Sequence, residues 1–203
     1  MDQVADVPEH WPVQDSTDLY RSALPFALRA DQVRHPASAD EEPFTRVVLE
    51  HPGAVVVLAM DDEDQVICLR QYRHPVGMRM VELPAGLMDH DGEEPEDVAR
   101  RELAEEVGLR AGSWTHLTSA YSSPGITEEC IHYFLARDLG PIGEGDLDGF
   151  VREHEEADMT IEWVPFRRLY DAVLGNEVTD APLLLAVLSA VAAGLVSVTT
   201  SSD

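Results

Sequence analysis

The chain has 203 residues, of which 44% are hydrophobic, so it can bury a core of its own. Asp and Glu number 39 against 14 Lys and Arg, and the resulting formal charge of −25 argues against nucleic-acid binding because such a surface repels phosphates. All 14 basic residues are Arg, which excludes chemistry that depends on a P-loop lysine or a Schiff-base lysine.

Residues 1–50 contain scattered prolines and short strand-like runs such as FTRVVLEH, and they predict a small N-terminal β appendage. The first residues, MDQVADVPEHW, show neither the basic nor the apolar region of a signal peptide. Cys68 and Cys130 lie in apolar runs and indicate core thiols in a reducing compartment. The uncharged run 181–198 favours a core helix over a membrane span, because Pro182 and small residues interrupt it. We therefore expect a cytoplasmic protein without a membrane partner.

A compact domain is predicted from residue 51 to residue 203. The β-rich runs GAVVVLAM and QVICLRQY are joined by DDEDQ, which predicts a hairpin. Further strands are predicted at 80–84, 114–120, 130–136 and 159–165, and helices at 95–108, from residue 166 and from residue 182. Because strands outnumber helices, the pattern predicts an α/β (α+β mixed) fold with helices packed on the faces of a mixed sheet.

The first predicted helix carries an unusual group of acids. Its last part, RRELAEEVGL, places Glu102, Glu105 and Glu106 at positions i, i+3 and i+4, so that like charges lie one turn apart. Carboxylate oxygens gathered in this way are the ligands that a hard divalent cation prefers. The glycine-bearing loop before the helix can add backbone carbonyls. The segment therefore predicts a metal site, with a solvated acidic face as the alternative.

The segment 83–109, LPAGLMDHDGEEPEDVARRELAEEVGL, resembles the Nudix box, G-x5-E-x7-R-E-U-x-E-E-x-G-U, in which U is a bulky aliphatic residue. Gly86 and Glu93 match its first two positions, and residues 101–109 match its end. Six residues instead of five separate Gly86 from Glu93, but the extra residue lies in the loop ahead of the helix. The resemblance implies a Nudix-type α/β/α sandwich with a mixed sheet, a small N-terminal antiparallel β-sheet, and hydrolysis of a nucleoside diphosphate linked to another moiety.

The resemblance also implies Mg²⁺ as cofactor, with Mn²⁺ as the alternative. The implied ligands are one backbone group and three carboxylates: Ala85, Glu102, Glu105 and Glu106. Arg101 and Glu93 are expected to hold the ligating acids in place. A metal ion in such a site draws charge off phosphate oxygens and lowers the pKa of a bound water.

The segments that flank the box narrow the choice of substrate. FTRVVLEHPGAVVVLA, RQYRHPVG, LPAGLMD and SSPGITEE resemble segments of ADP-ribose pyrophosphatases, so that the similarity runs from about residue 46 to residue 165. This implies conversion of ADP-ribose to AMP and ribose 5-phosphate, with substrate contacts from four residues: Arg46, Arg73, Leu87 and Glu128. It further implies a homodimer in which the appendage, residues 1–50, makes contacts between subunits and both subunits line the pocket of the hydrolase domain, residues 51–203.

The base that activates the attacking water is expected in a late loop, because in the resembling enzymes it often lies outside the box. The loop REHEEAD precedes the strand-like run MTIEWVPF. Alignment of that run places Glu155 at the base position, with Glu156 as second choice and Glu105 as third. Ala157 stands where some relatives offer another metal carboxylate.

Three alternatives stay open. The enzyme could prefer NADH, a nucleotide sugar, a dinucleoside polyphosphate or an oxidised nucleotide. The protein could bind ADP-ribose without catalysis. Finally, Glu144, Asp146, Asp148 and Gly149, followed by Glu155, match the spacing of a calcium-binding EF-hand loop except that Glu stands at its first position, although a Gly-Pro run stands where the entering helix belongs.

Overall fold

The computed structural model describes four stretches of the chain: residues 4–37, 42–90, 92–143 and 158–198. The chain divides into two compact units. One, which we call the sheet unit, consists of Met1–Pro52 and Tyr121–Glu129, and the other, the core unit, consists of Gly53–Ala120 and Cys130–Asp203. The sheet unit thus combines the whole predicted appendage with the later segment SSPGITEE.

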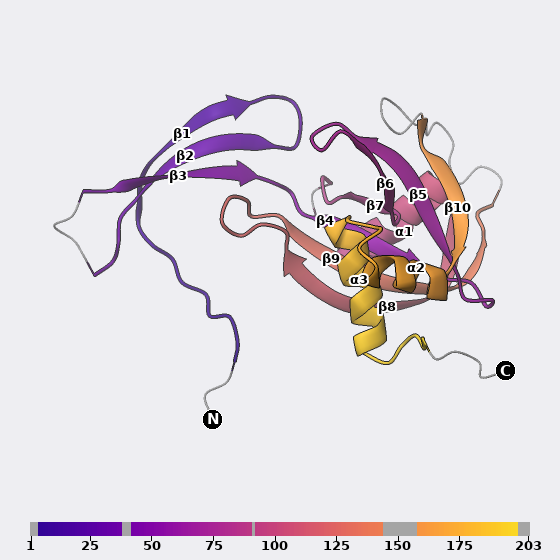
Figure 1. The fold of residues 1–203 in the computed structure, drawn as a ribbon. Helices are drawn as coiled ribbons and strands as arrows, with labels where there is room; N and C mark the ends of the chain where they lie inside the picture. Colours follow the sequence, from indigo (N-terminus) through magenta and orange to yellow (C-terminus); the bar gives the residue numbers. More distant parts are fainter. Residues whose placement is uncertain (1–3, 38–41, 91, 144–157, 199–203) are drawn as a thin grey trace. The chain divides into compact units, whose positions relative to one another are not determined.

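The sheet unit is an antiparallel sheet of three strands in chain order, β1 (Val13–Arg21), β2 (Ala27–Val33) and β3 (Phe44–Glu50) (Figure 1). The predicted small antiparallel sheet is therefore present. Only β3 shows an apolar run in the sequence. β1, VQDSTDLYR, is exposed along its whole length, so no burial pattern marks it as a strand. The segment 121–129 joins this unit because the Leu49 N–H donates to the Ile126 carbonyl at 2.8 Å.

The core unit contains two sheets (Figure 1). The four-stranded sheet has the order β7 (Ala85–Leu87), β4 (Ala54–Ala59), β9 (Cys130–Pro141), β8 (Leu109–Tyr121), and it is mixed because β4 runs antiparallel to β7 and parallel to β9. The three-stranded sheet has the order β10 (Thr160–Pro165), β5 (Gln65–Arg73), β6 (Met78–Glu82), and all its pairs are antiparallel.

The predicted hairpin of the two runs joined by DDEDQ is wrong. Those runs are β4 and β5, which belong to different sheets and share only the isolated bridge between Met60 and Val66. β4 is buried on both faces; it pairs along its whole length with β9 and through Ala54–Val56 with β7. A strand in this central position takes its partners from distant parts of the sequence, which an acidic turn next to it does not reveal.

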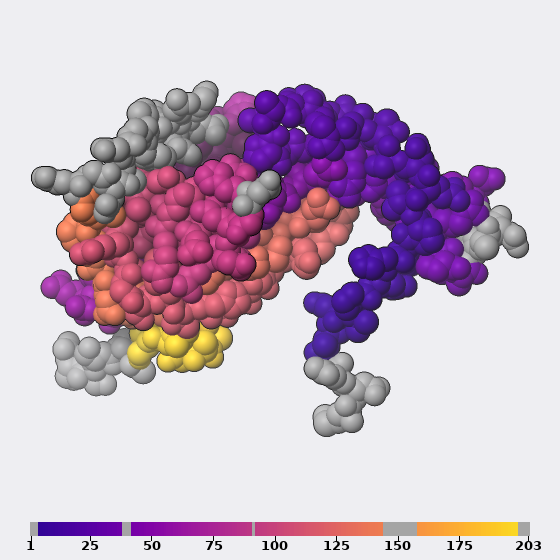
Figure 2. Space-filling model, turned by 180° about the vertical axis from the view of Figure 1, so that it is seen from behind, coloured from indigo at the N-terminus to yellow at the C-terminus, as the bar shows by residue number. Residues whose placement is uncertain are grey.

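Helices cover both faces of the four-stranded sheet, as expected for an α/β/α sandwich. Val55 and Val57 of β4 pack in one core cluster with Leu103 of α1 (Pro95–Val107). The alternate residues, such as Leu58, pack in a second cluster with residues of α2 (Phe166–Leu174) and α3 (Ala181–Ala192). Seen from behind, the magenta to salmon atoms that include α1 and β8 form a continuous surface of the core unit (Figure 2). Among the described residues, no helix is long and apolar enough to cross a membrane.

Helix α1 begins and ends where its sequence predicts. Pro95 occupies its first turn, and the acids Glu96 and Asp97 favour the positive end of the helix dipole. Gly108 ends the helix with φ of 68°, a left-handed conformation that glycine adopts without steric cost. Its N–H donates to the Ala104 carbonyl at 2.9 Å. These local signals fix which residues α1 presents to the loop in front of it.

Candidate active site

The backbone of β7 lies directly against the acids of α1. An ideal Cβ placed on Gly86 would stand 1.9 Å from Cδ of Glu102, so only glycine permits this approach. The N–H of Ala85 donates to Oε2 of Glu106 at 2.9 Å. Two consecutive loop residues therefore meet two acids that are one helical turn apart.

Arg101 is the centre of an ion-pair network at the same place. Its Nη1 donates to Glu102 at 2.6 Å and to Glu105 at 3.1 Å, and its Nε donates to Glu93 at 3.3 Å. Its Nη2 donates to the backbone carbonyl of Leu87 at 3.3 Å. One guanidinium thus connects the loop strand β7, Glu93 just before α1, and two acids of the helix. This is more than the ordinary i to i+4 pair with Glu105 that its position alone would give.

The acids of α1 show the mutual repulsion that is expected of like charges one helical turn apart. Burial is the main cause that raises the pKa of Glu102 to about 7; the charge of Arg101 opposes this rise and the charge of Glu105 adds to it. Glu106 is only 8% exposed. Carboxylates this close and this buried repel each other unless a positive charge lies among them.

The donor set fits a hard divalent cation in its chemistry, since every predicted ligand offers oxygen. As the side chains stand, no three His, Cys, Asp or Glu among the described residues are grouped so that they could hold an ion. Each acid has another partner instead: Arg101 donates to Glu102 and Glu105, and the Ala85 N–H donates to Glu106. Gly86 nevertheless keeps the loop backbone against Glu102.

Of the predicted substrate contacts, Leu87 and Arg73 belong to the core unit. Leu87 lies in the loop strand β7, where its carbonyl accepts from Arg101. Arg73 ends β5 and forms two hydrogen bonds to Glu82, at 2.8 and 2.6 Å. Sequence analysis did not single out Glu82, although an acid inside the apolar run MRMVELPAG is a signal that could have drawn attention to it.

Arg46 and Glu128, the other two predicted substrate contacts, belong to the sheet unit. The guanidinium of Arg46 lies 4.5 Å from the centre of the Phe44 ring, and Glu128 accepts from Arg29 at 3.5 Å. Arg29 also donates to Glu50 at 2.8 Å, so Glu128 borders an ion-pair cluster of this sheet. Within their unit, both residues are exposed to solvent.

Several predicted positions lie outside the described residues. These are the candidate bases Glu155 and Glu156, Ala157, and the EF-hand-like positions 144–149. Their roles stay predictions. The third candidate base, Glu105, lies on α1 with its carboxylate bound to Arg101.

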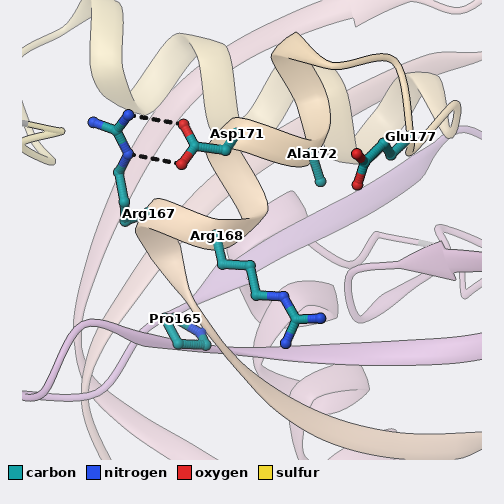
Figure 3. A pocket seen from close by; sticks show the side chains of 6 residues that line it. All are labelled: Pro165, Arg167, Arg168, Asp171, Ala172 and Glu177. Carbon is teal, nitrogen blue, oxygen red and sulfur yellow. Dashed lines mark hydrogen bonds and ion pairs between the residues drawn. The ribbon is translucent and has the colours of Figure 1, made fainter.

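A cavity of about 410 Å³ on α2 is separate from the acids of α1 and the loop in front of them (Figure 3). Arg167 and Asp171 face each other there in an ion pair, while Arg168 extends away from them and pairs with no described acid. α2 packs in the core cluster on the face of β4 opposite to α1, so this cavity does not adjoin the acids of α1. Its remaining lining residues offer a proline, an alanine and one more acid, which do not form a reactive group: Pro165, Ala172 and Glu177.

Comparison with known proteins agrees with the geometry of the loop and helix. The family described as NUDIX domain matches residues 50–186. The chain belongs to this family. It is 42% identical to "ADP-ribose pyrophosphatase" of Mycobacterium tuberculosis (strain ATCC 25618 / H37Rv), over 86% of this chain and 80% of that protein. It is 43% identical to "ADP-ribose pyrophosphatase" of Bacillus subtilis (strain 168), over 63% of this chain and 70% of that protein.

A solved structure supports the Nudix fold as well. The crystal structure of an "ADP compounds hydrolase" matches with a TM-score of 0.71 over 94% of this chain and 97% of that chain, at 21% identity. The predicted family and fold class are therefore confirmed. Nudix hydrolases generally use a divalent metal ion, which agrees with the all-oxygen donor set of the loop and α1.

Proposed function

We propose that this Nudix protein is a pyrophosphohydrolase that splits the diphosphate of ADP-ribose into AMP and ribose 5-phosphate. One water molecule adds across the P–O–P bond, so that each phosphorus keeps its own organic group. The observation that carries the proposal is the approach of the Gly86 backbone to Glu102 beside the Ala85–Glu106 hydrogen bond. The two ADP-ribose pyrophosphatases that the chain resembles support the choice of substrate.

In this proposal Mg²⁺ is the cofactor, with Mn²⁺ as the alternative. The ion would be held by the carbonyl of Ala85 and by Glu102 and Glu106, with Glu105 beside them. When bound, it would neutralise charge on the phosphate oxygens and make a bound water more acidic. Arg101 contributes by holding the carboxylates of Glu102 and Glu105, whose negative charges would otherwise repel each other.

Substrate recognition is assigned to the four residues that the sequence predicted: Arg46, Arg73, Leu87 and Glu128. Arg73 supplies a cation for the diphosphate, and a guanidinium suits phosphate because its N–H groups pair with two oxygens at once. Leu87 contacts the substrate through its backbone. Arg46 and Glu128 of the sheet unit contact the nucleoside or ribose parts, with Glu128 accepting a hydrogen bond from a ribose hydroxyl.

The base is assigned to Glu155, with Glu156 and then Glu105 as the next choices. In general, a base on a loop can complete a site only after the substrate has bound, and closure over the substrate then excludes bulk water. Glutamine variants of the three residues separate these choices. The variant of the true base loses kcat while its affinity for ADP-ribose stays nearly unchanged, because a base acts chiefly in the transition state.

We further propose that the protein works as a homodimer in the cytoplasm and that its sheet unit takes part in the subunit contact. One face of this sheet carries a row of apolar side chains, Tyr20, Leu28 and Leu49, brought together by the strand register. Tyr20 is 60% exposed, and the unit is too small to cover this face by itself. The buried, unpaired thiol of Cys68 agrees with a reducing compartment.

The deciding experiment is a substrate panel. Purified protein is incubated with Mg²⁺ and ADP-ribose, NADH, a nucleotide sugar or a dinucleoside polyphosphate, and products are separated by chromatography. We expect AMP and ribose 5-phosphate from ADP-ribose with the highest kcat/KM. A tenfold higher kcat/KM for another compound would overturn the substrate assignment, and binding of ADP-ribose without turnover would overturn catalysis.

A further inference from the structure

Arg73 and Glu82 form a two-pronged ion pair in which the acid is buried and the arginine is partly exposed. Nε of Arg73 donates to Oε1 of Glu82 at 2.8 Å, and Nη2 donates to Oε2 at 2.6 Å. Two parallel hydrogen bonds fix the plane of the guanidinium, whereas a single bond would let it rotate. The two residues come from neighbouring strands, β5 and β6, of one antiparallel sheet.

The two partners differ in exposure. The side chain of Glu82 is 7% exposed, while that of Arg73 is 43% exposed. Nη1 of Arg73 forms no hydrogen bond to a described residue, so the edge of the guanidinium that faces away from Glu82 keeps its donors. The acid is thus buried and the arginine presents a fixed, outward edge of N–H groups.

Two further acids act on Arg73 through their charges. The pKa of Arg73 is raised, first by its hydrogen bonds to Glu82 and also by the charges of Asp180 and Glu106. Asp180 is the N-cap of α3, where its carboxylate accepts the Leu183 N–H at 2.9 Å. Arg73 therefore lies within electrostatic reach of acids from three elements, one of which is a proposed metal ligand.

Because these acids are near, the orientation of Arg73 decides which carboxylate it pairs with. A guanidinium that was free to rotate would be attracted to any of the nearby carboxylates. Pairing with Glu106 would place a positive charge on a proposed metal ligand and would remove the arginine from the substrate. The buried carboxylate of Glu82 prevents this, because leaving that acid without its partner would be strongly destabilising.

We propose that Glu82 is a positioning residue that turns the free edge of Arg73 toward an anionic group of the substrate, its diphosphate. This inference rests on the proposed function for the identity of the anion. Glu82 does not touch the substrate. It acts by fixing the plane of the guanidinium, so that the remaining N–H groups of Arg73 are oriented before the substrate arrives.

The experiment combines kinetics with a direct measurement on Arg73. Glu82→Gln, Arg73→Gln and the double variant are compared for kcat and KM with the substrate that the wild type cleaves best in the panel. Glu82→Gln keeps the shape of the side chain but offers only one acceptor oxygen. We expect KM to rise about tenfold, the size expected for the loss of one hydrogen bond to a charged group, with kcat changed less than about threefold.

The double variant tests whether Glu82 acts through Arg73. If it does, Glu82→Gln has no further effect once Arg73 is Gln, so the two changes are not additive. Glu162→Gln is the matched control, because Glu162 of β10 pairs at 2.7 Å with Arg70, which lies on β5 as Arg73 does. We expect this control to leave KM unchanged. Additive effects of Glu82→Gln and Arg73→Gln would overturn the inference.

Nuclear magnetic resonance of ¹⁵N-labelled arginine side chains tests the orientation without any substrate. The Nε–H signal of Arg73 is assigned by its loss in Arg73→Lys. Its relaxation is expected to report a rigid side chain in the wild type and a mobile one in Glu82→Gln. An equally rigid signal in both proteins would overturn the inference even if ADP-ribose is cleaved. Failure of the wild type to cleave ADP-ribose would instead overturn the proposed function. If Glu82→Gln does not fold, Glu82→Asp, which keeps the charge but draws it back by one methylene, replaces it with the same expectations.

Discussion

The N–H of Ala85 donates a 2.9 Å hydrogen bond to Oε2 of Glu106, an acid 21 positions later in the chain. This bond joins the short strand β7 to the last turn of α1. It also orients Ala85 and Glu106, both proposed metal ligands, at the same site. The first prediction concerns this bond, because it allows the structural and the chemical role of Glu106 to be separated.

Glu106→Gln is expected to keep the fold and lose activity. The amide oxygen of Gln can still accept the Ala85 N–H, so the melting temperature should change little. The variant lacks the negative charge that a divalent ion needs, and we expect kcat to fall about 10²-fold or more, equivalent to about 2.7 kcal/mol of barrier. Steady-state kinetics at saturating Mg²⁺ measures this. Glu96→Gln, at an exposed position of the same helix, is the control, and near-normal turnover of Glu106→Gln would contradict the ligand assignment.

Gly86→Ala is expected to damage the site more than the fold. The added Cβ would stand 1.9 Å from Cδ and 2.4 Å from Cγ of Glu102, so that this side chain must move away. Because Glu102 can rotate, we expect a loss of unfolding free energy of only about 1 kcal/mol. The displaced carboxylate should lower kcat/KM at least tenfold and raise the Mg²⁺ concentration needed for half-maximal activity.

Gly140→Ala is the matched control for this change. It also adds a methyl group to a glycine of the core unit, but the nearest atom, Nε of Arg110, is 3.8 Å away. This control should retain its activity. Unchanged metal dependence of Gly86→Ala would show that Glu102 does not contribute to the metal site.

The buried N-cap Asp180 predicts a pH-dependent stability difference. Burial raises its pKa from 3.8 to about 6, while its bond to the Leu183 N–H lowers it. A raised pKa means that the folded state binds this proton more tightly than the unfolded state does. The stability that the proton contributes is therefore present below about pH 4 and is lost as the pH rises through about 6.

Asp180→Asn keeps a capping oxygen without the charge. Relative to the wild type, we expect this variant to gain of the order of 2 kcal/mol of unfolding free energy between pH 4.5 and pH 7. Urea unfolding at the two pH values measures the difference. Asp171→Asn, in an exposed pair with Arg167 on α2, controls for general charge effects. A difference that does not change with pH would contradict the raised pKa.

The apolar face of the sheet unit predicts a variant that separates the subunits. Tyr20 and Leu49 flank Leu28 in one row across β1, β2 and β3. Tyr20→Glu places a charge in this row, and we expect it to convert the homodimer into a monomer with much lower activity. Light scattering combined with the ADP-ribose assay measures both properties.

Leu24→Glu is the control for the subunit contact, because Leu24 is similarly exposed but lies between β1 and β2. It should leave the dimer intact. An active wild-type monomer at the assay concentration would contradict the proposed dimer, and a dimeric Tyr20→Glu variant would place the contact elsewhere.

The sequence predicted those features that depend on local spacing. The periodicity of α1 and its boundaries at Pro95 and Gly108 follow from the geometry of a helix, in which positions i, i+3 and i+4 share one side. The acids Glu102, Glu105 and Glu106 were therefore placed together without knowledge of the fold. The same spacing identified the family, and the β-rich run GAVVVLAM predicted the strand that is β4.

Only the tertiary structure decided the features that depend on distant pairing. It placed β4 between β7 and β9 instead of beside β5, it formed the exposed strand β1, and it brought Glu82 and Asp180 to Arg73. Arg73 and Asp180 are more than 100 positions apart in the sequence. Side chains so far apart meet because strands and helices pack around a shared core, and their proximity leaves no local pattern that a reading along the chain could detect.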